Sequence, residues 1–256
     1  MKIAVITDVH ANLPALDAAL AAIKRDGCDA IYHTGDAIAI GPYPAETLDL
    51  LLATPGMRFV MGNHDEWFAH GLPEPRPDWM SDGELAHQRW THAQIDPALR
   101  TVVAGWPFVI EETIDGVPLT FLHYGLASSR RALSAFVVDP DAGKLDALFA
   151  DESGVVICFG HDHRPCDVIG RARYVNPGSL GCHPAVTCFA TLTVTAGACQ
   201  VEHHAAPYDV TPVLRAFERR QVPERAFIVR TFFAGDSPDA HPLPRLSCDS
   251  HPDPLQ

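Results

Sequence analysis

Strand and helix patterns alternate through the first third of the sequence, and this order constrains the fold more than any other feature. Three short apolar runs have the length of buried strands, and helical patterns fill the gaps between them. The predicted strands span residues 2–7, 30–34 and 58–61, and the predicted helices span 14–26 and 44–53. A βαβαβ order produces a parallel sheet that is covered by helices.

The rest of the chain changes from helical to strand patterns and ends in a polar segment. Residues 65–105 have a mostly helical pattern, interrupted by the turn-forming sequence GLPEPRPD. Asp115 and Gly116 predict a hairpin turn. The later elements that we expect are strands at 107–114, 117–123, 155–159, 167–175, 187–195 and 198–205, and helices at 140–150, 211–220 and 223–233. Residues 236–256 are rich in Pro, Asp and Ser and predict a disordered tail, which leaves residues 1–235 as one domain.

The composition excludes several classes of protein. The chain has 256 residues and a net charge of −13, so it would repel phosphate backbones, and we expect no stable nucleic-acid binding. Apolar stretches are too short for a membrane span, and the first residues turn polar too soon for a signal peptide, so we expect a cytoplasmic protein without membrane contact. The seven cysteines include no CxxC pair, which argues against a zinc knuckle and a disulfide framework. No feature indicates an oligomeric state.

Side chains that commonly bind metals follow five of the predicted strands. In chain order they are Asp8, His10, Asp36, Asn63, His64, His123, His161 and His163. Sites in open α/β sheets form at the carboxyl ends of the strands, so we expect these side chains to meet. The pair His161 and His163 also has the spacing with which two imidazoles can face the same way.

Each of these residues has a simpler explanation when it is taken alone. Gly35–Asp36 can be an ordinary turn, Asn63 can cap a helix, and His123 can be a hydrogen-bonded core histidine. Their occurrence together, in order, at successive strand ends favours a metal site. Oxygen and imidazole donors suit Mn, Fe, Zn or Ni, and two ions bridged by one carboxylate can share a water and lower its pKa.

At this point the sequence resembles a known superfamily. The order DVH, GD, GNHD, a strand-ending His and GHDH resembles the calcineurin-like metallophosphoesterases over residues 2–181. The stretches DVHANLPAL, GPYP, ELAHQRWTHAQI, NPGSLG and PYDVTPVLRAFERRQVPE are similar to a bacterial branch of small phosphoesterases. The resemblance implies an α/β fold: a four-layer α/β/β/α sandwich with two mixed β-sheets and a metal site at the carboxyl ends of the strands.

The resemblance also implies a role for each residue at the strand ends. Two divalent metal ions would share Asp36, the first held also by Asp8, His10 and His163 and the second by Asn63, His123 and His161. His64 would hold no metal and would face the leaving-group oxygen. Asp65 either orients the His64 ring or simply begins a helix. Manganese is the metal that we expect, with iron, zinc, nickel and cobalt as alternatives.

The sequence departs from the superfamily pattern where phosphate is gripped. Phosphoprotein phosphatases carry arginines beside GD and GNH, and none stands there in this chain. This absence favours a singly charged diester over a monoester dianion, because a dianion gains more from guanidinium contacts. Arg130, Arg131 and Arg164 follow ligand-bearing strands and are either a substitute grip or solvated surface charge.

Other departures concern the shape of the pocket. Tyr124 stands where the branch usually has glycine, and it either stacks on a base or aryl group or faces the core. Ala11 and Ala39 also stand where the branch tends to have glycine. Asn12 is a candidate phosphate neighbour, as are Asn176 and Ser179 of the NPGS sequence, with turn formation as the alternative for all three.

Together these observations predict a dinuclear metal-dependent phosphoesterase. It would hydrolyse phosphodiesters or small phosphorylated metabolites by attack of a hydroxide that bridges the two ions. The alternatives are a phosphomonoesterase or protein Ser/Thr phosphatase, and a nucleoside polyphosphate hydrolase. A non-catalytic binding module on the same fold is less favoured, because every ligand position is filled.

Overall fold

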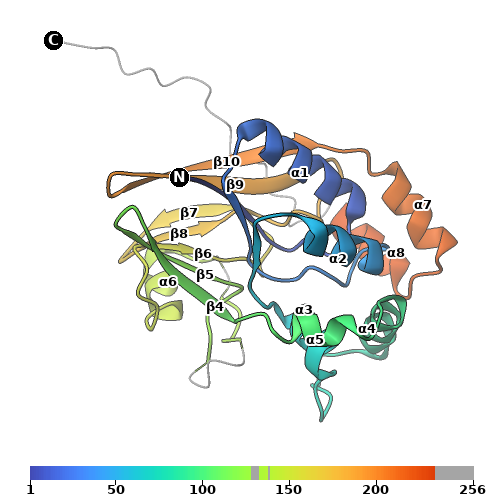
Figure 1. Cartoon of the computed structure of the whole chain (residues 1–256). Helices are drawn as coiled ribbons and strands as arrows, with labels where there is room; N and C mark the ends of the chain where they lie inside the picture. Colours follow the sequence, from blue (N-terminus) through green and yellow to red (C-terminus); the bar gives the residue numbers. More distant parts are fainter. Residues whose placement is uncertain (128–132, 138, 234–256) are drawn as a thin grey trace.

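Figure 1 shows a computed structural model of the chain, which describes residues 1–127, 133–137 and 139–233. Within these residues the strands form two five-stranded sheets, in the orders β10-β9-β1-β2-β3 and β4-β5-β6-β8-β7. The first sheet contains β1 (Lys2–Ile6), β2 (Ala30–His33), β3 (Met57–Phe59), β9 (Val186–Thr195) and β10 (Ala198–Pro207). The second contains β4 (Val109–Ile114), β5 (Val117–Leu122), β6 (Val156–Cys158), β7 (Cys166–Ile169) and β8 (Arg173–Asn176).

Each sheet has a parallel centre and antiparallel edges. In the first sheet, β2 is parallel to both β1 and β3, and β9 runs antiparallel to β1 and β10. In the second, β6 is parallel to both β5 and β8, while β4 and β7 pair antiparallel with their neighbours. Because the central strands of each sheet are parallel, their carboxyl ends lie along one edge.

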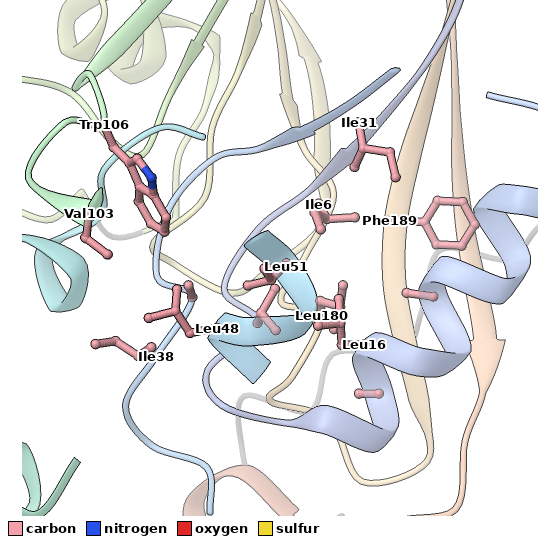
Figure 2. Packing of buried hydrophobic residues seen from close by; sticks show 14 of the residues in the cluster. Ile6, Leu16, Ile31, Ile38, Leu48, Leu51, Val103, Trp106, Leu180 and Phe189 are labelled. Atoms are coloured by element: carbon pink, nitrogen blue, oxygen red, sulfur yellow. The ribbon is translucent and has the colours of Figure 1, made fainter. Parts of the chain in front are cut away.

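Helices cover the outer face of each sheet (Figure 1). The helical segments are α1 (Leu13–Asp26), α2 (Pro44–Ala53), α3 (Asn63–His70), α4 (Asp82–Gln94), α5 (Leu99–Val103), α6 (Ala142–Leu148), α7 (Thr211–Arg219), α8 (Arg225–Ile228) and the π-helical turn η1 (Val229–Phe233). Leu16 of α1 and Leu48 of α2 pack with Ile6 of β1 in one cluster (Figure 2). On the other side, Leu145 of α6 packs with Tyr174 of β8.

The two sheets pack directly on each other through a third cluster of buried side chains. Ile3 and Tyr32 of the first sheet meet Phe121 and Val175 of the second. The rings of Tyr32 and Phe121 are stacked, with centroids 3.9 Å apart. The layers are therefore α/β/β/α with two mixed sheets, as the sequence analysis predicted.

Local sequence signals account for the first helix. The Asn12 side chain accepts a hydrogen bond from the Ala15 N–H at 3.2 Å, and Pro14 occupies the first turn, where its missing N–H costs nothing. Gly27 ends the helix in the left-handed conformation, with φ of +70°. This helix follows the prediction to within one residue.

The predicted strand at 167–175 is wrong. The segment forms two antiparallel strands, β7 and β8, in which Val168 pairs with Tyr174. The bend between them is closed by a hydrogen bond from the Gly170 N–H to the Ala172 carbonyl, and the Arg171 N–H is bound by Asp146 of α6. A tertiary contact with α6 thus stabilises a turn that the apolar pattern alone did not show.

Two other expectations concern the C-terminal tail and membrane-spanning helices. The predicted tail, residues 236–256, lies outside the described residues, and its disorder stays a prediction. Among the helices described here, none combines the length and the apolar character that a bilayer crossing requires.

Phe121→Ala tests the packing between the sheets. Phe121 is fully buried and stacked on Tyr32, so its truncation leaves a cavity and is expected to lower the free energy of unfolding by about 3–5 kcal/mol. Ile169→Ala on β7, where the side chain is 77% exposed, should change it by less than about 0.5 kcal/mol. Urea unfolding followed by circular dichroism measures both, and similar losses in the two variants would contradict this packing scheme.

Candidate metal centre

The candidate ligands lie on sharp loops that follow the strands. Five of them have a left-handed backbone, a conformation that Asp and His adopt more readily than most residues. Their φ angles are +51° at Asp8, +47° at His10, +60° at Asp36, +74° at His161 and +62° at His163. Such residues cluster at functional sites, because only a constrained environment holds them in this conformation.

Backbone hydrogen bonds join these loops across both sheets. The Asp8 N–H donates to the Gly35 carbonyl at 3.0 Å, and the Gly160 N–H donates to the His123 carbonyl at 2.8 Å. A third bond runs from the Gly181 N–H to the Asp8 carbonyl at 3.0 Å. The loops therefore form one connected layer at the edge where the parallel strands end.

One cluster of side chains forms around the first strand. Nε2 of His10 lies 2.9 Å from Nε2 of His163, and each of these nitrogens lies 3.7 Å from Oδ1 of Asp8. His10 Nε2 is also 3.9 Å from Oδ2 of Asp36. The four side chains that the resemblance assigns to the first ion are thus together.

A second cluster adjoins the first and shares Asp36 with it. Nε2 of His123 lies 3.3 Å from Asp36 Oδ2 and 3.2 Å from the Asn63 amide oxygen. The rings of His123 and His161 are perpendicular neighbours with centroids 5.1 Å apart. The structure therefore brings together all seven candidate ligands, with the Asp36 carboxylate between the two clusters.

The imidazoles are oriented by bonds on the side away from the clusters. His10 Nδ1 lies 3.2 Å from the Ile38 carbonyl, and His123 Nδ1 lies 2.8 Å from the Thr34 carbonyl. A carbonyl only accepts, so Nδ1 carries the proton in both rings and Nε2 can present its lone pair to the cluster. This arrangement is typical of histidines that bind metals.

Charge and burial keep most of these imidazoles neutral. Burial lowers the pKa of His161 to about 3 and that of His163 to about 4, and it lowers the pKa of His10 well below the usual value. Neutral imidazole is the form that binds metals. His123 differs, because the facing Asp36 carboxylate outweighs burial and raises its pKa. Burial raises the pKa of Asp8, whereas the imidazoles of His123 and His64 outweigh burial and lower that of Asp36.

A cavity of about 360 Å³ opens beside the two clusters. His10, Asp36, Asn63, His64, His161 and His163 form its polar side. Phe227, Ile228 and Phe232 from α8 and η1 form an apolar wall. Glu84 and His87 of α4 and Glu224 are also in the lining, and none of the described residues that line the cavity is Lys or Arg.

Gln88 contacts the ring of His64. The Gln88 Nε2 amide lies 2.9 Å from His64 Nδ1 and donates to the Glu84 carboxylate at 2.7 Å. Because the carboxylate only accepts, it fixes the amide nitrogen toward the imidazole, and His64 Nδ1 is the acceptor. The His64 proton then sits on Nε2, which lies 3.9 Å from Asp36 Oδ2.

Asp65 does not orient His64, contrary to one of our two interpretations. Its buried carboxylate accepts hydrogen bonds from the backbone N–H groups of Gly62 at 3.0 Å, Asp36 at 2.8 Å and Ala37 at 3.0 Å. It therefore caps α3 and fastens the loop that carries Asp36 to it. A Cβ at Gly62 would collide with the Asp36 carboxylate, so only glycine permits this approach.

Two predicted substrate neighbours are structural. Asn12 is fully buried, caps α1 and donates to the Gly181 carbonyl at 2.8 Å. The Tyr124 ring is 2% exposed, so of its two interpretations the core position is correct. It packs against His161, with centroids 4.8 Å apart, and its hydroxyl accepts from the Val137 N–H.

Asn176, Ser179 and Arg164 also have structural contacts outside the cavity. Asn176 donates to the Gly160 carbonyl, and Ser179 donates to the Asp8 carbonyl at 2.8 Å, so both hold ligand loops together. Arg164 pairs with Asp139 at 3.3 Å and is not in the cavity lining. Arg130 and Arg131 lie outside the described residues.

The sequence analysis missed several residues near the clusters. Gln88 and His87 lie in the stretch ELAHQRWTHAQI, whose similarity to the phosphoesterase branch was noted without a role for either. Glu84 and Gln88 are four residues apart, a spacing that places them on one helix face and could have indicated their contact. The apolar wall residues fall in the predicted helix at 223–233, and nothing in their pattern pointed to the site.

Comparison with known proteins places these motifs in a family. The model of the calcineurin-like phosphoesterase superfamily domain matches residues 1–197. The uncharacterized protein MJ0912 of Methanocaldococcus jannaschii is 31% identical over 163 residues, which cover 64% of this chain and 63% of that protein. The chain therefore matches less than two thirds of the length of this relative.

Solved structures show the same fold. The hypothetical protein PH1004 of Pyrococcus horikoshii superposes with a TM-score of 0.76 at 19% identity, covering 92% of this chain and 99% of that one. A metallophosphoesterase from Sphaerobacter thermophilus gives a TM-score of 0.70 at 23% identity, covering 90% of this chain and 97% of that one. At these identities the comparison supports the fold, including the segment after residue 197.

Asp65→Asn tests the fastening role of this carboxylate. An amide group cannot accept all three backbone hydrogen bonds, and one buried donor left unpaired costs about 1–3 kcal/mol of stability. We expect a loss of this size in urea unfolding, together with weaker metal binding. Asp17→Asn on the exposed face of α1 is the control and should change neither. Unchanged stability with an altered pH profile of kcat would instead support an orienting role toward His64.

Proposed function

The chain belongs to the calcineurin-like phosphoesterase superfamily, and from this membership we propose that it is a dinuclear metal-dependent phosphodiesterase. The observation that carries the proposal is the convergence of seven candidate ligands on two adjoining clusters that share Asp36. The superfamily itself supports the coarser statement, a metal-dependent phosphoesterase.

The donors present fit two divalent cations. In each of three groups of residues, the ligand atoms lie within 4.8 Å of one another. The groups are His10, Asp36 and His64; Asp36, His123 and His161; and His10, His163 and Cys182. The first position would be held by Asp8, His10, Asp36 and His163, and the second by Asp36, Asn63, His123 and His161. Both sets contain only imidazole and oxygen donors, which suit Mn²⁺ among other cations. Bound there, the two ions would supply charge stabilisation and a water of lowered pKa.

The charge of the cavity favours a diester substrate. A phosphomonoester dianion is best held by guanidinium or ammonium groups, and the described lining contains neither. Glu84 and Glu224 add negative charge to the lining. A diester carries one negative charge and depends less on such groups.

The apolar wall favours a substrate with an aryl or alkyl substituent. Phe227 is 51% exposed, and the Phe232 ring lies 5.7 Å from that of His163, so both are within the space beside the clusters. Burial of an apolar group against such side chains is favourable by about 25 cal/mol per Å². We therefore propose a small diester with one apolar ester group as the substrate class.

His64 is the hydrogen-bond donor to the leaving group in this proposal. Gln88 holds the neutral ring with Nδ1 as acceptor, so the Nε2–H points toward the cluster and can donate a hydrogen bond that stabilises the charge developing on the leaving oxygen of a substrate. His64 Nε2 is also the group that stays free when the seven ligands are assigned. Its position thus combines access to the substrate with a fixed proton.

Metal-dependent hydrolysis tests the function. After chelation and addition of Mn²⁺, Ni²⁺, Zn²⁺, Co²⁺ or Mg²⁺, bis-p-nitrophenyl phosphate should be hydrolysed at least as fast as p-nitrophenyl phosphate. Asp36→Ala should abolish turnover and lower occupancy of both positions, because its carboxylate is common to the two clusters. Arg164→Gln should keep full activity. Absence of hydrolysis with every metal, or two ions retained by Asp36→Ala, would overturn the proposal.

A pair of variants tests the His64 contact. His64→Ala should keep both ions and lose about 10²–10³-fold in kcat on an alkyl ester, with a smaller loss on a nitrophenyl ester whose leaving group needs little stabilisation. Gln88→Leu should lose about 2–12-fold, the effect of one hydrogen bond of about 0.5–1.5 kcal/mol, with KM unchanged. Arg89→Gln, on the exposed side of the same helix, is the matched control. Equal losses on both esters would exclude a donor role for His64.

A further inference from the structure

One side chain at the first cluster belongs to none of the motifs discussed so far. Cys182 follows the NPGSLG sequence, and its Sγ lies within 4.8 Å of ring nitrogens of both His10 and His163. It is a free thiol, and it is not among the residues that line the cavity. Its position therefore points to the ligand cluster rather than to the substrate.

The loop that carries Cys182 is fixed to the loop that carries Asp8 and His10. The Leu180 N–H donates to the Thr7 carbonyl at 3.0 Å, and the Ser179 hydroxyl donates to the Asp8 carbonyl at 2.8 Å. The Cys182 N–H in turn donates to the Ser179 hydroxyl at 3.0 Å. A Cβ at Gly181 would collide with the Val9 carbonyl, so the two loops are in direct backbone contact.

The neighbouring imidazoles supply the independent evidence of a ligand. The Nε2 atoms of His10 and His163 face each other at 2.9 Å, and the His10 proton is engaged on Nδ1 by the Ile38 carbonyl. Two imidazole nitrogens and a sulfur that converge in this way form a set of donors typical of a transition-metal site.

We propose that the Cys182 sulfur is an additional ligand of the first metal position, beside Asp8, His10, Asp36 and His163. This inference rests on the proposed metal centre and deepens it. Thiolate is a soft donor, so the first position would prefer Zn²⁺, Co²⁺ or Fe²⁺ to Mn²⁺, whereas the second position has no sulfur donor. The thiol releases its proton to solvent when the cation binds. The two positions would then differ in metal preference.

Cobalt titration of the metal-free full chain tests the inference by spectroscopy. Co²⁺ bound to thiolate gives an intense near-ultraviolet charge-transfer band, which nitrogen and oxygen donors do not give. Wild type and Cys28→Ser, a control at the far end of α1, should both show this band. Cys182→Ser should lack it while still binding Co²⁺. Its Zn²⁺ affinity should fall by at least about 10–100-fold, the loss that follows removal of a group that only hydrogen-bonds to a metal ligand. Its Mn²⁺ affinity should change little.

The possible outcomes separate this inference from the proposed function. A band that persists in Cys182→Ser, or that is absent from all three proteins while two Co²⁺ ions bind, overturns the role of Cys182 and leaves the phosphodiesterase proposal in place. Failure of any Co²⁺ to bind overturns the metal centre itself. If Cys182→Ser does not fold, alkylation of the wild type decides: Zn²⁺ must protect Cys182 from iodoacetamide and leave Cys28 reactive.

Discussion

The candidate site depends on hydrogen bonds between loops that follow different strands. Asp65 fastens the Asp36 loop to the start of α3. The Gly160 N–H joins the loop that follows β6 to the His123 carbonyl. Each of these bonds is buried, so it also satisfies a polar group that would otherwise be unpaired. The loops consequently form one layer across both sheets. Without that layer neither cluster would have a fixed geometry, because each combines side chains that follow strands of both sheets.

The same layer holds its residues in unfavourable backbone conformations. A left-handed residue other than glycine costs about 1–3 kcal/mol, and Ala11, Ala39 and Ile40 have φ angles of +51°, +69° and +60°. These side chains gain no hydrogen bond in return, unlike the Asp and His residues nearby. The cost is offset by the packing of the sheets and helices beneath the loops, and a cation bound only by the folded state would add to that stability.

The sequence predicted the ligands well because strand ends and ligand types are both local signals. Asp8, Asp36 and Asn63 could be placed along one edge because they follow the parallel strands β1, β2 and β3, whereas the position of His123 beside Asp36 came from the family resemblance, because β5 is in the other sheet. The sequence failed where a contact joins distant backbone. The N–H donors to the Asp65 carboxylate, the burial of Asn12 and the turn inside 167–175 all depend on loops or helices far along the chain. Likewise, the sequence could place Gln88 on one face of a helix, but it could not show that His64 lies against that face.

The candidate ligands and the apolar wall of the cavity come from different parts of the chain. The ligands all lie within residues 1–197, which the family model covers, whereas Phe227 and Phe232 lie beyond it. His87 connects the two parts, because its Nε2 accepts from the Ile40 N–H, and its Nδ1 lies 3.2 Å from the Pro223 carbonyl. The segment that leads into the apolar wall is thus attached, through His87, to the loop that follows Asp36. This histidine therefore keeps the segment that carries the wall in register with the ligand clusters.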